Sequence, residues 1–572
     1  MKIKTYKYED SPKKLVRARF SALDIEKLFE NKKFVTKRKD TKRNSELYEI
    51  FLSKKDVYLD SKYPHIFNQV SSNSVHLILS GIPLEKFYLL NPIGLQAIHQ
   101  HKIYRWKYPE ALTLRLKSNN SCGINLIESE LKIPMEQRLF LTKLESLFRY
   151  EYNEGISTYK DLFSTKFLIN LLRLHMPSNY IGVKGIKYLA ETKFLINVTL
   201  LNLNDNDLGD EGAKLLASNV TIPNLEVLML TKNSIGLRGI KELSQNLTWT
   251  HLTHLDLGHN FYFGMEGAHY LSRNETWTNL QVIDFSGNNL GFSGIREISK
   301  NLVWKELKKL IISHNNIAKF PYDIKKNFEK VEVLCVSFNE LGDQGVIEIA
   351  KIPHMNLINI NLQGNLINDK GIISLSKNNT WSNLKTLNLS NNNITSKGIK
   401  ELIKNKCWRK LQILKLSIND IGDNGASSLA SNLTWNELTE LDIAGNNISY
   451  SGISAFAKYS SWVKLKYLDV SINDIKNRGA KELANNIRWK ELVSLNLEYN
   501  YDIDFESSKV LMCNKNWTNL EFLKLNGNLL TEDQCSYLRE LSKTIKVSFQ
   551  SLDSETDLKE VKKLTICELA FS

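Results

Sequence analysis

The chain has 572 residues, of which 42% are hydrophobic, and 76 basic residues against 62 acidic ones give it a formal net charge of +14. No apolar run approaches the roughly 18 residues that a membrane span needs, and the charged first twenty residues lack the apolar core of a signal peptide. The six cysteines are scattered without a Cys-x-x-Cys pair. We therefore expect no membrane span and a cytoplasmic, reducing location, with nuclear entry or non-classical secretion left open.

Residues 1–45 are predicted to form a basic, flexible arm. Residues 1–43 hold 15 lysine and arginine residues against 6 acidic ones, so most of the excess positive charge lies there. The run at residues 32–43 is typical of a nuclear localisation or phosphate-binding patch, or of a solvated linker. Because nucleic-acid binding depends on neutralising phosphates, we expect such binding only weakly, and only through residues 1–43.

Residues 46–164 do not repeat, and we predict a mainly helical cap or adaptor region there. The stretch from Val75 to Trp106 resembles an F-box, at about residues 70–106, although the opening Leu-Pro-x-Glu of that family is missing. The resemblance implies a module that docks on a ubiquitin ligase. The alternative is a helical cap that covers the exposed core of the first repeat, which every solenoid requires.

From about residue 165 to residue 535 the sequence repeats about every 27 residues. Nine tryptophans fall at intervals of 27 or 28, apart from one gap of 77 between Trp304 and Trp381. A period of this length is typical of a solenoid. Aligned asparagines keep the same register and mark a weak first unit at Asn179 and thirteen clear units, at Asn206, Asn233, Asn260, Asn288, Asn315, Asn339, Asn365, Asn392, Asn419, Asn446, Asn473, Asn500 and Asn528.

Each unit reads as a short strand followed by a helix. Apolar alternation, as at Leu441 and Ile443, predicts the strand. The asparagine after it, such as Asn446, can satisfy backbone groups in the turn, and stacked asparagines can form a ladder. A glycine six or seven residues later, such as Gly452, opens an amphipathic helix. Neighbouring units must stack to bury both faces, which predicts parallel strands on a concave face and helices on a convex face.

The helix is expected to end at a second asparagine, three residues before the repeated tryptophan, as Asn432 precedes Trp435. Asparagine tolerates the left-handed conformation that often ends helices. Tyr459 takes the place of this asparagine in one unit. We interpret the repeated tryptophan as a buried plug of the core.

The pattern LxxLxLxxNxL across residues 165–535 resembles the leucine-rich repeat family. The segment 201–217, Leu-Asn-Leu-Asn-Asp-Asn-Asp-Leu-Gly-Asp-Glu-Gly-Ala-Lys-Leu-Leu-Ala, is similar to its ribonuclease-inhibitor-like subclass. The resemblance implies an α/β solenoid. It leaves the function open, because the family includes inhibitors, receptors, ligase adaptors and bacterial effectors.

Two units depart from the pattern. The unit at Asn315 lacks the helical glycine and runs into Pro321, and the next unit is shortened to 24 residues. We expect a distorted outer face there, with the concave strand kept. The unit at Asn500 also lacks the glycine. Residues 536–572 are predicted to form a C-terminal cap.

The third and fifth positions of LxxLxLxxN point out of the core and onto the concave face. Apolar anchors mixed with charge are typical of protein interfaces, whereas exposed Ile, Val and Tyr can also reflect β-propensity alone. The candidate partner-binding residues form an early cluster, Val227, Met229, Asp256 and Asp284, and a late cluster, Ile413, Lys415, Glu440, Asp442, Tyr467, Asp469, Tyr499, Phe522 and Lys524.

The sequence contains no P-loop, nucleophile elbow, HExxH or dinucleotide fingerprint. His99 and His101 could hold a metal ion, but no third ligand lies nearby. Too few residues follow the array for Cys567 to belong to the catalytic domain of a ligase effector. Arg173 lies near the first repeats, where Ran GTPase-activating proteins carry an arginine, but the surrounding motif does not match. We predict no catalytic residue, no cofactor and no metal, and therefore no enzyme.

We therefore predict a monomeric, non-catalytic scaffold that binds a protein partner of unknown identity through the concave face. Two alternatives remain open. One is a substrate-recruiting adaptor of a ubiquitin ligase, and the other is a bacterial effector that acts on a host protein.

Overall fold

The computed structural model describes residues 37–40, 45–53, 74–80, 146–148, 159–160, 163–164, 168–169, 171–260, 263–321, 328–352, 356–541 and 545–548. The chain divides into two compact units. The smaller comprises Met1–Tyr150 with Lys166–Arg173, and the larger comprises Glu151–Thr165 with Leu174–Ser572.

The smaller unit contains a three-stranded antiparallel sheet in the order β1 (Lys37–Asp40), β2 (Ser45–Ser53) and β3 (Ser74–Ser80). A further strand, β4, covers Ser146–Phe148. The sequence predicted mainly helices for residues 46–164, so β2, β3 and β4 differ from that expectation. The period-two pattern of Val75, Leu77 and Leu79 explains the strand β3.

Several predictions fall on residues that the structure does not describe. The basic arm lies outside the described residues apart from β1, and the F-box-like stretch apart from β3. The His99–His101 pair and Cys567 also lie outside them. These predictions stay predictions.

The larger unit alternates short strands with helices. Its strands are β5 (Arg173–His175), β6 (Leu200–Asn202), β7 (Val227–Met229), β8 (His254–Asp256), β9 (Val282–Asp284), β10 (Lys309–Ile311), β11 (Val333–Cys335), β12 (Asn359–Asn361), β13 (Thr386–Asn388), β14 (Ile413–Lys415), β15 (Glu440–Asp442), β16 (Tyr467–Asp469), β17 (Ser494–Asn496), β18 (Phe522–Lys524) and β19 (Lys546–Ser548). Its helices are α6 (Gly182–Glu191), α7 (Gly209–Ala217), α8 (Leu237–Ser244), α9 (Gly264–Ser272), α10 (Gly291–Ile298), α11 (Gly342–Ala350), α12 (Asp369–Ser376), α13 (Ser396–Leu402), α14 (Gly422–Ala430), α15 (Tyr450–Tyr459), α16 (Lys476–Ala484), α17 (Phe505–Met512) and α18 (Glu532–Leu541).

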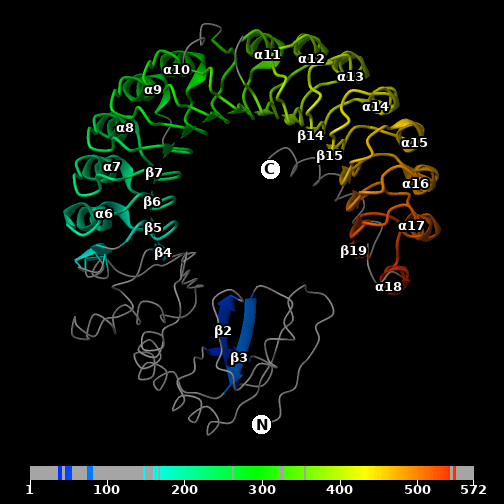
Figure 1. Ribbon diagram of the computed structural model, residues 1–572, viewed down its shortest axis with the longest axis horizontal. Coiled ribbons are helices and arrows are strands. Elements are labelled where there is room, and N and C mark those ends of the chain that lie inside the picture. The colour runs from blue at the N-terminus through cyan, green and yellow to red at the C-terminus, as the bar shows by residue number, and fades with distance from the viewer. Residues whose placement is uncertain are drawn as a thin grey trace. The chain divides into compact units, whose positions relative to one another are not determined.

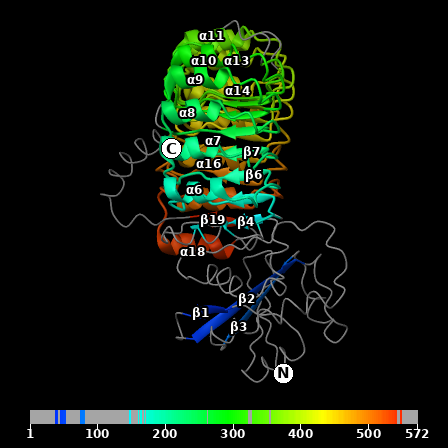
Figure 2. The same ribbon diagram turned by 90° about the vertical axis from the view of Figure 1, so that its left-hand side faces the viewer.

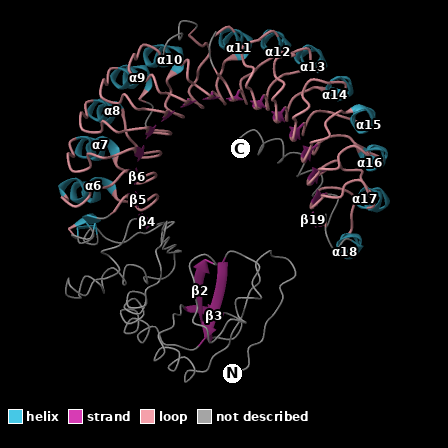
Figure 3. Cartoon of the chain, viewed as in Figure 1, coloured by secondary structure: helices cyan, strands magenta, loops and turns pink. Residues whose placement is uncertain are grey.

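The strands β6 to β19 pair in parallel and in chain order, each with the next. The middle residue of each strand from β6 to β18, for example Leu414 of β14, is buried between the sheet and the helices. Within the larger unit the strands line the concave side and the helices form the convex side (Figures 1 and 3). The turned view shows the helices α6, α7 and α8 as one layer beside the strands β6 and β7 (Figure 2). The predicted solenoid is confirmed.

The repeated tryptophans lie in the core, as predicted. Eight of them, from Trp249 to Trp489, are at most 1% exposed, and Trp517 is 4% exposed. Of these nine indoles, the one at Trp489 donates a hydrogen bond, to Ser460 Oγ at 3.0 Å, whereas the other Nε1 atoms have no partner. Packing, and not hydrogen bonding, therefore explains the tryptophan repeat.

The predicted asparagine ladder is present in the turns that follow the strands. Asn206 Oδ1 accepts hydrogen bonds from the backbone N–H groups of Asn179 and Ile181 in the preceding unit. Its Nδ2 donates to the carbonyl oxygens of Met176 at 2.6 Å and Leu203 at 2.9 Å. The amide therefore ties each turn to its neighbour, and equivalent bonds recur down to Asn528.

The second asparagine of each unit acts differently from the prediction. No asparagine of this set is among the described residues with positive φ, so the expected left-handed helix cap is wrong. Instead Asn432 Oδ1 accepts from the N–H groups of Thr434 and Trp435, both at 2.9 Å. Its Nδ2 donates to Ile403 O in the preceding unit. The side chain thus forms a second ladder near the helix ends.

The irregular unit near Pro321 keeps its strand. Strand β10 pairs in register with β9 and β11, while residues 322–327 lie outside the described residues. At the end of the array α18 crosses residue 535, and β19 adds one more strand to the sheet. Among the residues described, no helix has both the length and the apolarity needed to cross a membrane.

Candidate functional site

The concave face consists of the side chains that flank each buried central residue of a strand. In β14, Ile413 and Lys415 are half-buried on either side of the buried Leu414. The same alternation holds in β7, β8, β9 and β15. All the strand residues of the early and late clusters therefore lie on this face, and Tyr499 follows β17 in the turn.

Strand register arranges the late cluster in two rows. One row contains Ile413, Glu440, Tyr467 and, beyond Ser494, Phe522. The other contains Lys415, Asp442, Asp469 and, beyond Asn496, Lys524. The structure thus brings together residues from five neighbouring strands, and Tyr467 is 47% and Phe522 36% exposed.

Part of the charge in the late cluster is paired internally. Lys415 Nζ lies 2.9 Å from Glu440 Oε1, and Lys546 Nζ lies 5.2 Å from the centre of the Phe522 ring. These contacts neutralise Lys415 and Glu440 against each other. Tyr467, Phe522 and Lys524 are the exposed strand residues of the late cluster.

Asp442 and Asp469 form the acidic part of the late cluster. The two residues are register partners on neighbouring strands. Burial and, to a lesser extent, the neighbouring Asp469 carboxylate raise the pKa of Asp442 to about 6. Asp442 Oδ1 accepts the Ala444 N–H at 3.0 Å, and Asp469 Oδ2 accepts from Asn496 Nδ2 at 2.7 Å. These carboxylates therefore serve local turns as well as the surface.

The early cluster occupies β7, β8 and β9. Val227 and Met229 flank the centre of β7, and Asp256 and Asp284 are register partners on β8 and β9. Asp256 Oδ1 accepts from Thr231 Oγ1 at 2.5 Å. Burial raises the pKa of Asp256, and the adjacent Asp284 carboxylate adds to this. The strands β10 to β13 separate the early cluster from the late one.

We call the residues immediately before each ladder asparagine the left-handed column; sequence reasoning named Tyr499 of this set as a candidate contact and missed the set as a whole. All of them from Ser178 to Gly527 have positive φ, whether glycine or not. A positive φ suits glycine better than a bulky residue. The column nevertheless holds the bulky residues His259, His314, Phe338, Ile418, Ile472 and Tyr499. Large residues at positions that favour glycine or asparagine were the available signal in the sequence.

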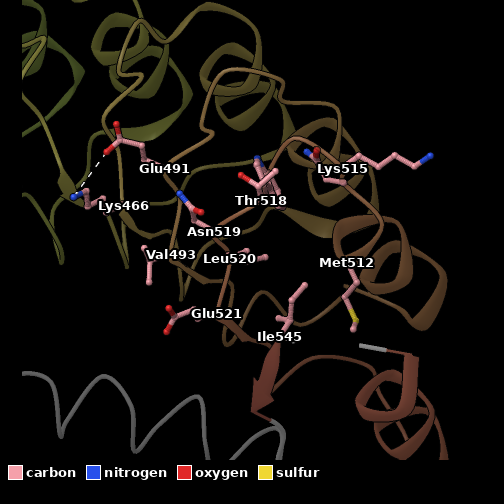
Figure 4. Close-up of a pocket in the computed structure, with 12 residues that line it drawn as sticks. Lys466, Glu491, Val493, Met512, Lys515, Thr518, Asn519, Leu520, Glu521 and Ile545 are labelled. Carbon is pink, nitrogen blue, oxygen red and sulfur yellow. Dashed lines mark ion pairs between the residues drawn. The ribbon is translucent and has the colours of Figure 1, made fainter. Parts of the chain in front are cut away.

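A pocket of about 870 Å³ lies where β16, β17 and β18 begin. Lys466 and Glu491 lie side by side on one wall, with Nζ and Oε2 3.8 Å apart (Figure 4). Met512, Trp517 and Ile545 supply apolar lining. The pocket adjoins the strands of the late cluster. Within the part of the chain that the structure describes, no three histidine, cysteine or acidic side chains are grouped to hold a metal ion.

A family model described as leucine-rich repeat matches residues 195–217, 250–272, 329–350, 382–402, 409–430, 432–457 and 463–484. A comparison with curated proteins finds no match.

Among solved structures, the chain is similar to an internalin (InlF) of Listeria monocytogenes, with 25% identity, coverage of 59% of this chain and 83% of that one, and a TM-score of 0.40. It is similar to a leucine-rich repeat protein of Leptospira interrogans, with 21% identity, coverage of 70% and 100%, and a TM-score of 0.41. It is also similar to the ectodomain of the membrane receptor kinase GASSHO1/SCHENGEN3 of Arabidopsis thaliana, with 20% identity, coverage of 73% and 48%, and a TM-score of 0.36. Seven segments within the array of stacked strand–helix units therefore match the leucine-rich repeat model.

Proposed function

We propose that the chain is a non-catalytic scaffold that binds a protein partner through the concave face, with the late cluster as the main contact. Leucine-rich repeat proteins are generally protein-interaction scaffolds. The observation that carries the proposal is the exposure of Tyr467 and Phe522 on one row of a rigid sheet. Aromatic side chains of this kind dominate the binding free energy of protein interfaces.

The arrangement also favours binding without large rearrangement. Tyr467 and Phe522 lie two strands apart, or roughly 10 Å, because neighbouring strands lie about 4.8 Å apart. Both side chains start from a sheet that is fixed by parallel pairing and by the asparagine ladder. A preformed surface loses little conformational entropy on binding. We propose that the chain acts as a monomer.

The finer expectations are retained as proposals. Helices that follow most strands, such as α7 and α14, support the ribonuclease-inhibitor-like subclass. The scattered cysteines support a cytoplasmic location. The ligase-adaptor and effector alternatives, and weak nucleic-acid binding by residues 1–43, rest on sequence patterns alone.

Affinity capture with the full chain as bait tests the proposal. The variant Tyr467→Ala/Phe522→Ala removes the exposed rings of the late cluster. The control Leu433→Ala/Ile487→Ala removes apolar side chains that are 72% and 63% exposed but lie outside the strands. We expect the control to retain a captured protein partner and the late-cluster variant to lose it.

The dissociation constant of the captured partner gives the quantitative readout. We expect the late-cluster variant to bind at least tenfold more weakly, since truncation of an interface hot spot costs about 2 kcal/mol or more. Circular dichroism and the urea midpoint should match those of the unchanged chain. Equal affinities for the late-cluster variant and the unchanged chain would refute the late cluster as the contact surface.

A further inference from the structure

Where the fifth position of the repeat holds Asp or Asn, its side chain has a structural task that needs an oxygen acceptor and no charge. Its side-chain Oδ1 accepts the backbone N–H two residues later, in the turn after the strand. An amide does this as well as a carboxylate, because Asn361 and Asn388 accept at 3.0 Å while Asp256 and Asp284 accept at 2.9 Å. The fold alone therefore does not explain a negative charge at this position.

At Asp256 and Asp284 the charge is unfavourable for the isolated fold. The two are register partners, and like charges directly opposite each other on neighbouring strands are destabilising. Burial already raises the pKa of Asp256, and the Asp284 carboxylate adds to this. Asparagine at both positions would keep the turns and remove the repulsion. The charge pair is better explained by a cation that approaches from outside.

The two carboxylates converge on the Cβ position that Gly258 leaves empty. A Cβ placed on Gly258 would lie 3.3 Å from Asp256 Oδ1, 3.5 Å from Asp284 Oδ1 and 3.5 Å from Thr231 Oγ1. Glycine thus leaves a small hollow between the two carboxylates on the concave face. Among the described residues, the hydrogen bonds to the Asp256 and Asp284 carboxylates go to Oδ1, and none goes to Oδ2 of either one. In the late pair, by contrast, Asp469 Oδ2 is held by Asn496.

A row of planar rings lies next to this hollow, in the left-handed column. His259 interacts electrostatically with Asp256, and its ring centre lies 5.9 Å from that of His314. His314 stacks on Phe338 at 4.7 Å with an interplanar angle of 12°. Between the two histidines lies Gly287, where a Cβ would overlap the His259 ring. The glycine therefore makes room for the His259 ring, whose plane is tilted by 53° to that of His314.

A guanidinium group fits both parts of this surface. It is planar and stacks on aromatic faces, and its fork of donors matches carboxylate oxygens. Burial lowers the pKa of His314, and the nearby His259 adds to this, so its ring stays uncharged at neutral pH and does not repel a cation. A lysine ammonium could meet the carboxylates, but it lacks the plane that stacks on the rings.

We propose that β8 and β9, with the rings of His259 and His314, bind an arginine side chain of the protein partner. The guanidinium of that arginine donates hydrogen bonds to the carboxylates of Asp256 and Asp284. This inference rests on the proposed function, that the concave face binds a protein, but it concerns a surface separate from the late cluster. The charge of the carboxylate pair complements the arginine, and the two rings select arginine over lysine.

Three blocked peptides, identical except for a central arginine, lysine or citrulline, test the proposal on the full chain. The readout is the ring C–H resonance of His259 and His314, in protein with 13C-labelled histidine and assigned by single histidine variants. We expect a saturable shift with the arginine peptide, weaker binding of the lysine peptide and no saturable shift with citrulline. Equal responses to arginine and citrulline, or none to arginine, would overturn the proposal.

The variant Asp256→Asn/Asp284→Asn keeps both turns and removes the charge. We expect it to bind the arginine peptide at least tenfold more weakly, while the matched Asp442→Asn/Asp469→Asn variant binds it unchanged. Peptide binding should also survive Tyr467→Ala/Phe522→Ala. If the arginine peptide does not bind but partner capture still depends on the late cluster, this inference is refuted and the proposed function stands. If the arginine peptide binds normally but partner capture does not depend on the late cluster, the proposed function is refuted and this inference stands.

Discussion

Replacing Asp442 by asparagine should make the array more stable at neutral pH and leave it unchanged in acid. The pKa of Asp442 is raised from 3.8 to about 6 by burial and by the neighbouring Asp469. A raised pKa means that the folded chain favours the protonated acid. The contribution of protonated Asp442 to the stability of the folded state is fully present below about pH 4 and is lost as the pH rises through 6. At about 1.36 kcal/mol per pKa unit, the loss approaches 3 kcal/mol above pH 7.

Asparagine mimics the neutral acid at this position. Its Oδ1 can still accept the Ala444 N–H, as Asn388 accepts the Ser390 N–H in its own turn. The variant should therefore keep the turn and remove the repulsion from Asp469. We expect the free energy of local unfolding of the variant to exceed that of the unchanged chain by about 1–3 kcal/mol at pH 8 and to match it at pH 4. The hydrogen bond between the side chains of Asp442 and Ser417 reduces the gain.

The gain should be local, because each unit of a solenoid contacts only its neighbours and long arrays do not unfold in one step. Amide hydrogen exchange of β14, β15 and β16 at pH 4 and pH 8, corrected for intrinsic rates, measures the local opening free energy. Asp207→Asn, an exposed carboxylate far along the array, serves as the control. The reasoning would be refuted if the variant were no more protected from exchange than the unchanged chain at pH 8. It would also be refuted if the variant changed the local opening free energy equally at both pH values.

Three further substitutions test the backbone requirements of the array, with the local opening free energy from amide hydrogen exchange as the readout. Asn446→Ala should cost about 1–3 kcal/mol, because Nδ2 bonds of 2.9 Å to Leu416 O and Ala444 O are lost from a buried site; a neutral change would contradict the ladder. Gly287→Ala should destabilise more than Gly422→Ala, since both have positive φ but only the Gly287 methyl group meets a side chain; equal costs would show that the ring above yields freely. Ile472→Asn should raise the stability by up to about 1 kcal/mol, because a β-branched residue at φ 53° is strained; a loss would mean that apolar contacts outweigh the strain.

The sequence predicts the array well because its requirements repeat. A buried indole such as Trp408 and a buried amide such as Asn446 recur at a fixed spacing, and each has one physical reason to be there. The same periodicity places the strand positions, so Tyr467 and Phe522 could be assigned to the concave face before any coordinates. These predictions depend only on local spacing and on the need of each unit to stack on the next.

Other features depend on contacts between units, which spacing does not show. Lys415 and Glu440 lie in different units, and nothing in either unit announces that they pair at 2.9 Å. The second asparagine, such as Asn432, was assigned to a left-handed cap because asparagine tolerates the left-handed conformation that often ends helices. In the structure, its side chain donates instead to the carbonyl of Ile403 in the preceding unit. Cross-unit bonds of this kind can be predicted only once the stacking register is known.

The concave face also separates residues that the fold needs from residues that it does not. The left-handed column would suit glycine or asparagine throughout, yet it holds Ile418 and Ile472 beside the late cluster. The fifth position would suit asparagine, yet Asp256 and Asp284 are stacked charges in the early cluster. Stability explains neither choice, and both fall where the face also exposes rings or carboxylates. Between them, β12 and β13 carry Asn361 and Asn388, whose turns are satisfied without charge. The residues that the fold does not require therefore fall in two separate regions, which is the pattern expected of a surface shaped by what it binds.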